Sequence, residues 1–353
     1  MTEPPEYEVV VIGGGPAGLT TALYATRLGH RTAVVERGGG RHTTVAHVHN
    51  LTGVSEEISG DELSERVIRQ LEEYGADYYE DDVASIDRVD ESPPRFRVDA
   101  ERATLSADRV VLATGFSDES PGISGLQRFV GRGLHYCLHC DAYALGDAPA
   151  FVLGNDGHAA HAAMVLLNFT DDVDLLLNGA DPTWNEDTAD QVEAHPIAVE
   201  SRSVVSAFPD GEDERRLGGL EFADGSRRTY VGGFAMYGRR YHGDLAEGMG
   251  CELRSDGAVA VDGARETSVD GAYAVGDVTH GQNQTPIAMG DGAYAGIAIH
   301  EDLRTFPVPA DEIDADDRSV EHDAPAAPAD LRARMRRVRE RDDHAGLTPS
   351  DDR

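Results

Sequence analysis

Apolar and polar positions in the first 36 residues follow the periods of a strand, a helix and a second strand. The segments at 8–13 and 32–36 are short and contain the continuous apolar runs VVVI at 9–12 and AVV at 33–35, as expected of buried strands. Between them, residues 16–29 have the spacing of a helix that begins at a proline. The glycine-rich turn between the first strand and the helix makes this a β-α-β unit.

The pattern continues as an α/β arrangement. A helix is predicted over 59–73, with Ser59 and Asp61 available as caps. Residues 83–105 indicate a strand meander that turns at two prolines, and a strand follows at 109–115.

The second half of the chain begins with a change of pattern. A Gly-rich connection over 116–147 carries two of the three cysteines, and a second β-α-β-like unit begins at 150–167. A last long helix is predicted over 285–303. Residues 307–330 are almost all Pro, Ala, Asp and Glu, which is typical of a disordered acidic linker, and a short basic helix is predicted after it.

The charge of the chain is strongly one-sided. Asp and Glu number 65 against 31 basic residues, all of them Arg, and the net charge is -34. Such a charge repels itself at low salt and keeps a protein soluble where salt screens it, which favours a halophilic, haloarchaeal origin. A GC-rich genome is the competing explanation for the absence of Lys. Nucleic-acid binding is disfavoured because it needs a basic surface.

The amino-terminal sequence leads from MTEPPEYE directly into the first strand, with no charged leader region and no cleavage site. No apolar run approaches the roughly 20 residues of a membrane span. We therefore expect a cytoplasmic protein without a membrane partner.

The first motif is a glycine turn of the G-x-G-x-x-G type, formed by Gly13, Gly15 and Gly18, with Pro16 and Ala17 between them. Small residues allow a tight turn and the close approach of a pyrophosphate to the start of a helix. Glu36 ends the next strand, where a carboxylate can accept hydrogen bonds from ribose hydroxyls. The context of strand, turn, helix and acid predicts a dinucleotide site.

The second motif is the segment TSVDGAYAVGDV at 267–278. Gly276 and Asp277 follow a short strand, and the aspartate is placed to bind the ribitol chain of a flavin. The segment LATGF at 112–116 supports this interpretation, as the crossing where the chain leaves a flavin domain. FAD is therefore the expected cofactor.

The third motif is a C-x-x-C pair, Cys137 and Cys140, followed by Asp141. Such a pair can form a small-ring disulfide whose first thiol is easily deprotonated near positive groups or a helix end. Zinc is the alternative, but a structural zinc site needs a second pair of ligands and Cys251 is isolated, although His135 and His139 could supplement the pair. Redox chemistry is favoured, and no metal is expected.

Taken in order, these motifs resemble the low-molecular-weight thioredoxin reductase family, class II pyridine nucleotide-disulfide oxidoreductases, over about residues 7–305. The stretches GRGLHYCLHCDAYALGDAPAFVLG and ETSVDGAYAVGDVTHGQNQTPIAMGDGAYAGIAI carry the resemblance. It implies an α/β fold of two Rossmann-like three-layer domains, and a homodimer. The expected boundaries are 1–117 and 244–306 for a discontinuous FAD domain, 118–243 for an inserted NAD(P)-binding-like domain that carries the C-x-x-C, and 307–353 for the linker and tail.

The resemblance also implies roles for single residues. Cys140 would face the flavin, Cys137 would attack the substrate disulfide, and Asp141 would be the nearby acid or base. Gln284, with Thr285 beside it before the last helix, would approach the isoalloxazine ring. The exposed thiolate would then exchange with a thioredoxin-like protein, or with a small disulfide or dithiol, through a mixed disulfide.

The inserted domain departs from the family at its nucleotide turn. The family binds NADPH through G-x-G-x-x-A and a basic segment for the 2′-phosphate, whereas this turn contains Asn155 and Asp156. A carboxylate close to a pyrophosphate is unfavourable, and no Arg occurs between Gly154 and Arg202. NADPH binding in the usual way is therefore not expected, although Arg239 and Arg240 could contribute in the fold. NADH use is left open, although nothing in the sequence supports it.

Three functions remain open at this point. The leading one is a thioredoxin reductase-like enzyme whose electrons come from ferredoxin or a reduced deazaflavin if the nicotinamide site is lost. The second is a flavin-dependent dithiol oxidase that uses oxygen; relatives of the gliotoxin type carry His after the second cysteine, whereas this chain has Asp141. The third is a flavin redox sensor, which the complete C-x-x-C disfavours.

Overall fold

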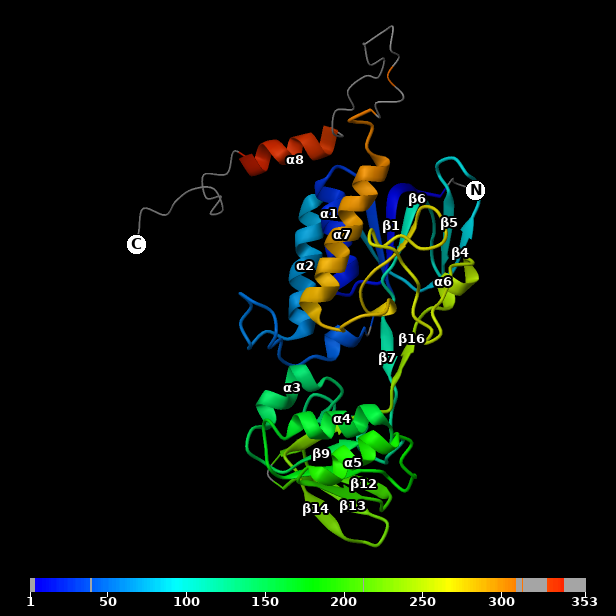
Figure 1. The fold of residues 1–353 in the computed structure, drawn as a ribbon. Helices are drawn as coiled ribbons and strands as arrows, with labels where there is room; N and C mark the ends of the chain where they lie inside the picture. Colours follow the sequence, from blue (N-terminus) through cyan, green and yellow to red (C-terminus); the bar gives the residue numbers. More distant parts are fainter. Residues whose placement is uncertain (1–3, 39, 212, 309–312, 314–328, 340–353) are drawn as a thin grey trace. The chain divides into compact units, whose positions relative to one another are not determined.

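The computed structural model describes residues 4–38, 40–211, 213–308, 313 and 329–339. The chain divides into two compact units, drawn in Figure 1. The first unit comprises Met1–Thr43, Asp61–Gly115 and Tyr241–Arg353, and the second comprises Thr44–Gly60 and Phe116–Arg240.

The first unit is built on a seven-stranded sheet with the order β3-β2-β1-β6-β5-β4, in which β17 also pairs with β6. Strands β1, β2, β3, β6 and β17 run parallel, and β4 and β5 form the predicted meander with β6. The strands are β1 (Glu6–Ile12), β2 (Thr32–Glu36), β3 (Asp77–Glu80), β4 (Val83–Arg88), β5 (Phe96–Ala100), β6 (Thr104–Leu112) and β17 (Ala272–Ala274).

Both faces of this sheet are covered, which is why the second half of β1, residues 9–12, is a continuous apolar run. Val9 and Val11 pack into one core with α1, α2 and α7, while Val10 and Ile12 pack into another with the meander and residues 246–278. The helices are α1 (Pro16–Arg27), η1 (Arg41–Thr44), α2 (Gly60–Tyr74), α6 (Asp244–Gly248), η3 (Gly276–Val278) and α7 (Thr285–Leu303).

Helices α1 and α7 lie side by side on one face of the sheet (Figure 1). Glycines on α7 allow this close packing. A Cβ atom at Gly292 would lie 2.2 Å from the carbonyl oxygen of Ala17, and one at Gly296 would lie 2.6 Å from the Cβ of Tyr24. The last helix is thereby held against the helix that follows the first glycine turn.

The second unit contains a parallel five-stranded sheet, β11-β10-β9-β15-β8, and a three-stranded antiparallel sheet, β12-β13-β14. Its helices are η2 (Gln127–Phe129), α3 (Leu138–Leu145), α4 (Gly157–Leu166) and α5 (Glu186–Ala194). Its strands are β8 (Leu134–His135), β9 (Ala150–Leu153), β10 (Val173–Leu176), β11 (Ile197–Glu200), β12 (Val204–Asp210), β13 (Asp213–Phe222), β14 (Arg227–Thr229) and β15 (Gly232–Ala235). Where the chain passes between the units, β7 (Phe116–Asp118) pairs with β16 (Arg239–Tyr241).

The predicted α/β class with Rossmann-type sheets is confirmed, and the helix predicted over 285–303 has these same bounds. The connection 116–147 is less irregular than its glycines indicate, since it contains α3. The basic helix near the carboxyl terminus is α8 (Ala329–Arg339). Most of the predicted acidic linker lies outside the described residues. Among the described helices, none has the length and apolar character needed to cross a membrane.

Candidate flavin and dithiol sites

The first glycine turn joins the end of β1 to the start of α1, and its glycines have no room for side chains. Gly13 has a φ of 109°, and a Cβ atom there would lie 2.3 Å from the carbonyl oxygen of Ala113. At Gly18 a Cβ atom would lie 2.0 Å from the oxygen of Gly13, whereas at Gly15 it would meet nothing within 4 Å. The turn is therefore closed towards the sheet and open at Gly15, as the approach of a pyrophosphate to the start of a helix requires.

Glu36 ends β2 beside this turn. Its carboxylate accepts hydrogen bonds from the backbone N–H of Gly14 and, at 2.7 Å, from that of Gly38. Burial and then the charges of Glu36 and Glu80 raise the pKa of the nearby Tyr78 hydroxyl to about 12. The carboxylate is held in place and keeps free lone pairs, as a ribose-binding acid needs.

The second motif meets the first at the carboxyl ends of the parallel strands. Ile12 of β1 pairs with Leu112 of β6, which pairs with Ala274 of β17, so these three strands end in register. Gly276, in η3, has a φ of 67°, and a Cβ atom there would lie 2.6 Å from the Cβ of Ala17. The two motifs, 260 residues apart in the chain, thus adjoin at the edge of an α/β sheet where ligands bind.

The remaining predicted flavin residues lie at the same edge. The Cβ of Asp277 is 4.0 Å from the Cβ position of Gly115, in the LATGF segment. Gln284 immediately precedes α7, which begins at Thr285, and the first turn of α7 places the Cβ of Ala288 3.6 Å from the Cβ position of Gly276. The starts of α1 and α7 and the residue Asp277 therefore lie at the same edge of the sheet.

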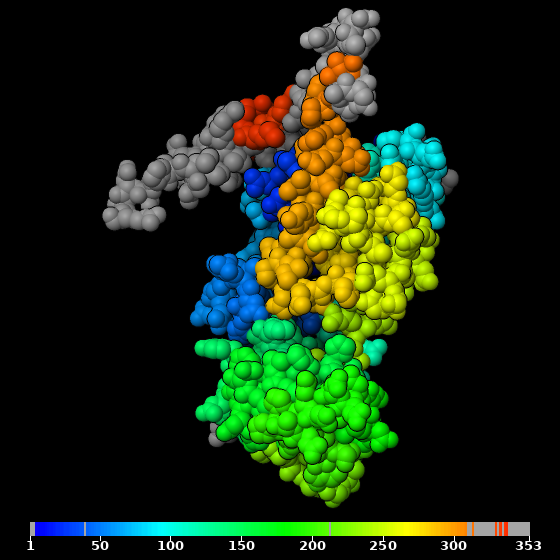
Figure 2. Space-filling view, viewed as in Figure 1, coloured from blue at the N-terminus to red at the C-terminus, as the bar shows by residue number. Residues whose placement is uncertain are grey.

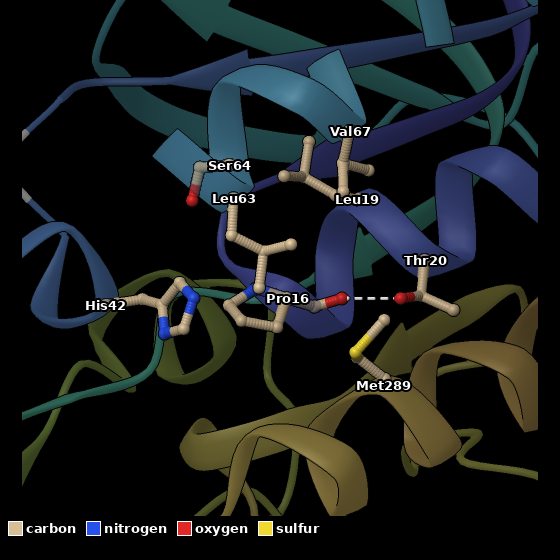
Figure 3. A pocket seen from close by; sticks show the side chains of 8 residues that line it. All are labelled: Pro16, Leu19, Thr20, His42, Leu63, Ser64, Val67 and Met289. Atoms are coloured by element: carbon tan, nitrogen blue, oxygen red, sulfur yellow. Dashed lines mark hydrogen bonds between the residues drawn. The ribbon is translucent and has the colours of Figure 1, made fainter. Parts of the chain in front are cut away.

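A hollow beside the first turn contains a residue that the sequence analysis did not single out. The hollow has a volume of about 250 Å³, including space open to solvent, and it lies next to the proline that begins α1 (Figure 3). Eight residues line it: Pro16, Leu19, Thr20, His42, Leu63, Ser64, Val67 and Met289. The side chain of His42 extends towards Pro16, and its Nε2 atom is buried with no hydrogen-bond partner in the protein. Burial, with the charge of Arg41, lowers the pKa of His42 and favours the neutral imidazole.

These features fit FAD. The glycine turn would hold the pyrophosphate, Glu36 the ribose, and Asp277 the ribitol chain; the unpartnered Nε2 of His42 is a polar group available beside the turn. The only sequence signal for His42 is its position six residues after Glu36, which by itself indicates no ligand.

The two cysteines of the C-x-x-C are linked by a disulfide at the start of α3. Cys137 is the residue before the helix, and its carbonyl oxygen accepts hydrogen bonds from the N–H groups of Cys140 and Asp141, both at 3.2 Å. Within the described part of the chain, no group of three His, Cys, Asp or Glu residues is arranged to hold a metal ion. Cys251 is buried, its thiol contacts the Thr267 hydroxyl, and burial raises its pKa.

Asp141 lies in the first turn of α3. Its Oδ2 atom is 3.2 Å from Nδ1 of His135, a residue that the sequence analysis considered only as a supplementary zinc ligand. The structure therefore places a histidine and a carboxylate on the segment that carries both sulfur atoms.

The turn at 154–159 in the second unit, which departs from G-x-G-x-x-A, forms a hydrogen bond with the carboxylate of its own Asp156. Asp156 is the N-cap of α4, and its Oδ1 accepts a hydrogen bond from the backbone N–H of Ala159 at 2.9 Å. The backbone oxygen of Asn155 accepts one from the N–H of Thr183 at 2.7 Å, and its side chain donates to the oxygen of Asp181. The helix terminus that would bind a pyrophosphate is thus already capped by a negative charge.

The first arginine after this turn is also engaged. Arg202 contacts Asp224 at 2.7 Å and pairs with Glu200, and these two carboxylates raise its pKa. Arg239 lies over the ring of Phe116, 5.1 Å from its centre. Of the basic groups considered for a 2′-phosphate, Arg202 is already neutralised.

Comparisons with known proteins show which family the chain is similar to. The sequence profile of the pyridine nucleotide-disulphide oxidoreductase family matches residues 7–292. The thioredoxin reductase of Peptoclostridium acidaminophilum is 30% identical over 310 residues, which cover 82% of this chain and 94% of that protein. The thioredoxin reductase structure from Streptococcus pyogenes has a TM-score of 0.79 and 26% identity, covering 86% and 100% of the two chains. The structure of HlmI has a TM-score of 0.79 and 30% identity, covering 86% and 94%.

The chain belongs to the pyridine nucleotide-disulphide oxidoreductase family. Within it, the chain is a thioredoxin reductase-like flavin disulfide oxidoreductase, an enzyme class that acts on sulfur groups, and it contains the Cys137–Cys140 pair.

Proposed function

We propose that this enzyme uses FAD and the Cys137–Cys140 disulfide to reduce a thioredoxin-like protein or a small disulfide. We also propose that its electron donor is not an NADPH molecule bound at the nucleotide turn of the second unit. The observation that carries the proposal is the contrast between its two nucleotide turns. The turn at Gly13–Gly18 is open at Gly15 for a phosphate. The turn at Gly154–Ala159 is capped by Asp156.

FAD, when bound, supplies a two-electron carrier that accepts electrons from a donor and gives them to a disulfide. The protein's part is to hold it: Gly13, Gly15, Pro16, Ala17 and Gly18 by backbone approach, and Glu36 by its carboxylate. Gly276, Asp277, Gln284 and Thr285 are the further residues that we assign to flavin binding. Asp277 and the start of α7 adjoin the first turn, which supports this assignment.

The cysteine pair carries out the exchange with substrate. An electron pair enters the Cys137–Cys140 bond, the bond breaks, and Cys137 leaves as a thiolate that Asp141 protonates. Asp141 takes this proton back, and the Cys137 thiolate attacks the substrate disulfide, forming a mixed disulfide and releasing one substrate thiolate. Cys140, the second thiolate formed when the bond broke, then attacks the mixed disulfide, which restores the Cys137–Cys140 bond and releases the second substrate thiolate. Solvent gives one proton to each of the two substrate thiolates. Two electrons and two protons reach the substrate in each cycle.

The electron donor is argued from the second unit. A pyrophosphate approaching α4 would meet the Asp156 carboxylate at the helix terminus. Arg202, the first arginine after this turn in the chain, is held by Glu200 and Asp224. Ferredoxin or a reduced deazaflavin are donors that need no such nucleotide turn. We therefore favour one of these donors over NADPH or NADH.

A dithiol oxidase is the second candidate, because the same capped turn suits an enzyme whose electrons come from a substrate dithiol and pass to oxygen. The carboxylate at Asp141, paired with His135, favours the reductase. A flavin redox sensor is disfavoured by the complete disulfide.

A homodimer formed through the first unit is supported by exposed apolar side chains on α1 and α7. Tyr294 is 63% exposed, and Ile287, Ile297 and Tyr24 are also exposed. Atoms of α7, coloured orange, lie at the surface in Figure 2. Sedimentation at high salt would show a two-chain species, and a Tyr294→Glu variant would shift it towards one chain.

The cellular setting follows from charge. A net charge of -34 supports a salt-rich cytoplasm, and a C-x-x-C pair that cycles between thiol and disulfide suits a reducing compartment. FAD binding and activity should then increase with salt concentration to the molar range.

The test is anaerobic mixing of the FAD-loaded protein, in high salt, with NADPH, NADH, reduced ferredoxin or a dithiol. The donor is the compound that bleaches the flavin band near roughly 450 nm at a catalytic rate. Rapid bleaching by NADPH would overturn the donor argument. Turnover of a disulfide substrate by a Cys140→Ser variant would overturn the role of the cysteine pair.

A further inference from the structure

The strand before the cysteine pair places a histidine against the carboxylate after it. His135 ends β8, the edge strand of the five-stranded sheet, and Asp141 lies in the first turn of α3. Their side chains are 11% and 24% exposed, and His135 Nδ1 lies 3.2 Å from Asp141 Oδ2. This distance is within the reach that proton-handling groups need.

The position of the imidazole is fixed by the core of the second unit. His135 pairs in register with Phe234 of β15, and the two rings lie 5.8 Å apart between centres. Phe234 is fully buried, and so is Leu134, the preceding residue of β8. The imidazole of His135 is therefore held against Asp141 by a packed strand. A histidine exposed to solvent could rotate its side chain and lose such a contact.

The position of Asp141 is fixed by the same short helix that holds the sulfur atoms. Its N–H donates to the Cys137 carbonyl oxygen at 3.2 Å, and the residue directly follows Cys140. Asp141 is therefore held next to Cys140 in the chain while its Oδ2 atom contacts His135.

The other titratable side chains of these elements do not provide the same contact. On α3, His139 and Tyr143 are exposed, and on the approach to the pair the Tyr136 hydroxyl contacts the Gln127 amide at 2.8 Å. Asp147, after α3, is exposed. On β15, Phe234 presents a ring without charge. Among the described side chains of these elements, His135 is the one observed in contact with the Asp141 carboxylate.

We propose that His135 is a positioning residue for Asp141 in thiol–disulfide exchange. This inference rests on the proposed function, because it assumes that Asp141 transfers the proton. When the Cys137–Cys140 bond accepts an electron pair, Asp141 gives its proton to the Cys137 thiolate and becomes a carboxylate. The Nδ1–H of His135 donates a hydrogen bond to that carboxylate and keeps it beside the pair until Cys137 returns the proton and attacks the substrate.

The test uses variants that keep or remove the group at Nδ1. His135→Asn places an amide N–H where Nδ1–H lies, His135→Gln extends it towards the position of Nε2, and His135→Phe removes it while keeping a flat ring. Each FAD-loaded protein is reduced anaerobically, and its exchange with a small aromatic disulfide is followed between about pH 5 and 9.

We expect His135→Phe to slow exchange about tenfold near neutral pH, the size of a lost hydrogen bond to a charged group. We also expect its pH profile to move upward by about one unit, while His135→Asn stays within about threefold of wild type and keeps the profile. His135→Gln should resemble the Phe variant. In an Asp141→Asn background, His135→Phe should cause no further loss.

Equal slowing by all three substitutions with an unmoved pH profile would show a merely structural role and overturn the inference. A His135→Phe variant with wild-type exchange at every pH would also overturn it. Failure of the proposed function would give a different result. Either the reduced wild-type protein would not exchange with the disulfide, or the Cys140→Ser variant would still turn over a disulfide substrate.

Discussion

The N-cap at Asp156 can be tested by separating its hydrogen bond from its charge. Asp156→Ala removes both, whereas Asp156→Asn keeps an oxygen that can accept from the N–H of Ala159, a fully buried residue. Loss of an N-cap acceptor costs about 1 kcal/mol. Loss of a carboxylate at a helix N-terminus costs about 0.5 kcal/mol more. Asp156→Ala should therefore destabilise the second unit by about 1.5 kcal/mol, and Asp156→Asn by about 0.5 kcal/mol.

A tryptophan near the start of α4 can report the unfolding of the second unit. Trp184 is the only tryptophan, and its Cβ lies 4.0 Å from the Cβ position of Gly157, the first residue of α4. For a unit of this size, 1 kcal/mol corresponds to a shift in melting temperature of about 3 °C. Thermal unfolding followed by Trp184 fluorescence should thus show a decrease of about 4 to 5 °C for Asp156→Ala and about 1 to 2 °C for Asp156→Asn.

Two outcomes would refute this reasoning. Equal losses in both variants would mean that the charge acts and the hydrogen bond does not, and an unchanged melting temperature in Asp156→Ala would mean that the cap contributes nothing. The same pair tests nucleotide binding. Removing one charge at about 4 Å in a water-like medium is worth about 1 kcal/mol, so Asp156→Asn should bind NADPH only about fivefold more tightly than wild type.

Three further predictions concern the first unit. Gly15→Ala should fold normally, because a Cβ atom there meets no protein atom within 4 Å, but it should lose FAD affinity because the turn is open for the pyrophosphate at this residue. Gly18→Ala should also lower the melting temperature, because its Cβ would lie 2.0 Å from the Gly13 oxygen. Equal melting temperatures of the two variants would contradict the turn geometry. Glu36→Gln should weaken FAD binding about tenfold through the lost charge-assisted hydrogen bonds, measured by flavin release on dilution; undiminished retention would count against the ribose assignment. Burial, with the charges of His30 and Arg304, lowers the pKa of His300, so the unfolded chain binds this proton more readily and stability should fall as pH decreases below about 6.5. His300→Gln should flatten that dependence in urea melts at pH 5 to 7, and an identical pH slope would contradict the assignment.

Local patterns predicted much of the flavin unit. Gly13, Gly15 and Gly18 occur at a spacing that only a tight turn explains, and the apolar run of β1 is buried on both faces. The helix after Gln284 could be predicted to its bounds because a proline and an apolar pattern mark it. The convergence of Gly276 with Ala17 was less accessible, since it depends on three strands ending in register.

Contacts set by distant pairing could not be predicted. His135 meets Asp141 because β8 pairs with β15, about 100 residues later in the chain, and no periodicity encodes that pairing. Helix α3 was missed because its N-cap is Cys137, which is outside the usual capping residues. That Asp156 is unfavourable for a pyrophosphate stays a prediction. Its role as an N-cap could also have been predicted, since Asp before Gly157 at the start of an apolar helical pattern is a helix-start signal.

The most direct test of the account is the number of electrons that the protein accepts, because it needs no knowledge of the natural donor. Anaerobic dithionite titration of the FAD-loaded wild type should consume about four electrons per flavin, two for the flavin and two for the Cys137–Cys140 disulfide. Cys140→Ser should consume about two. Uptake of only two electrons by wild-type protein, whose disulfide is intact at the start, would contradict the claim that flavin and cysteine pair form one redox circuit.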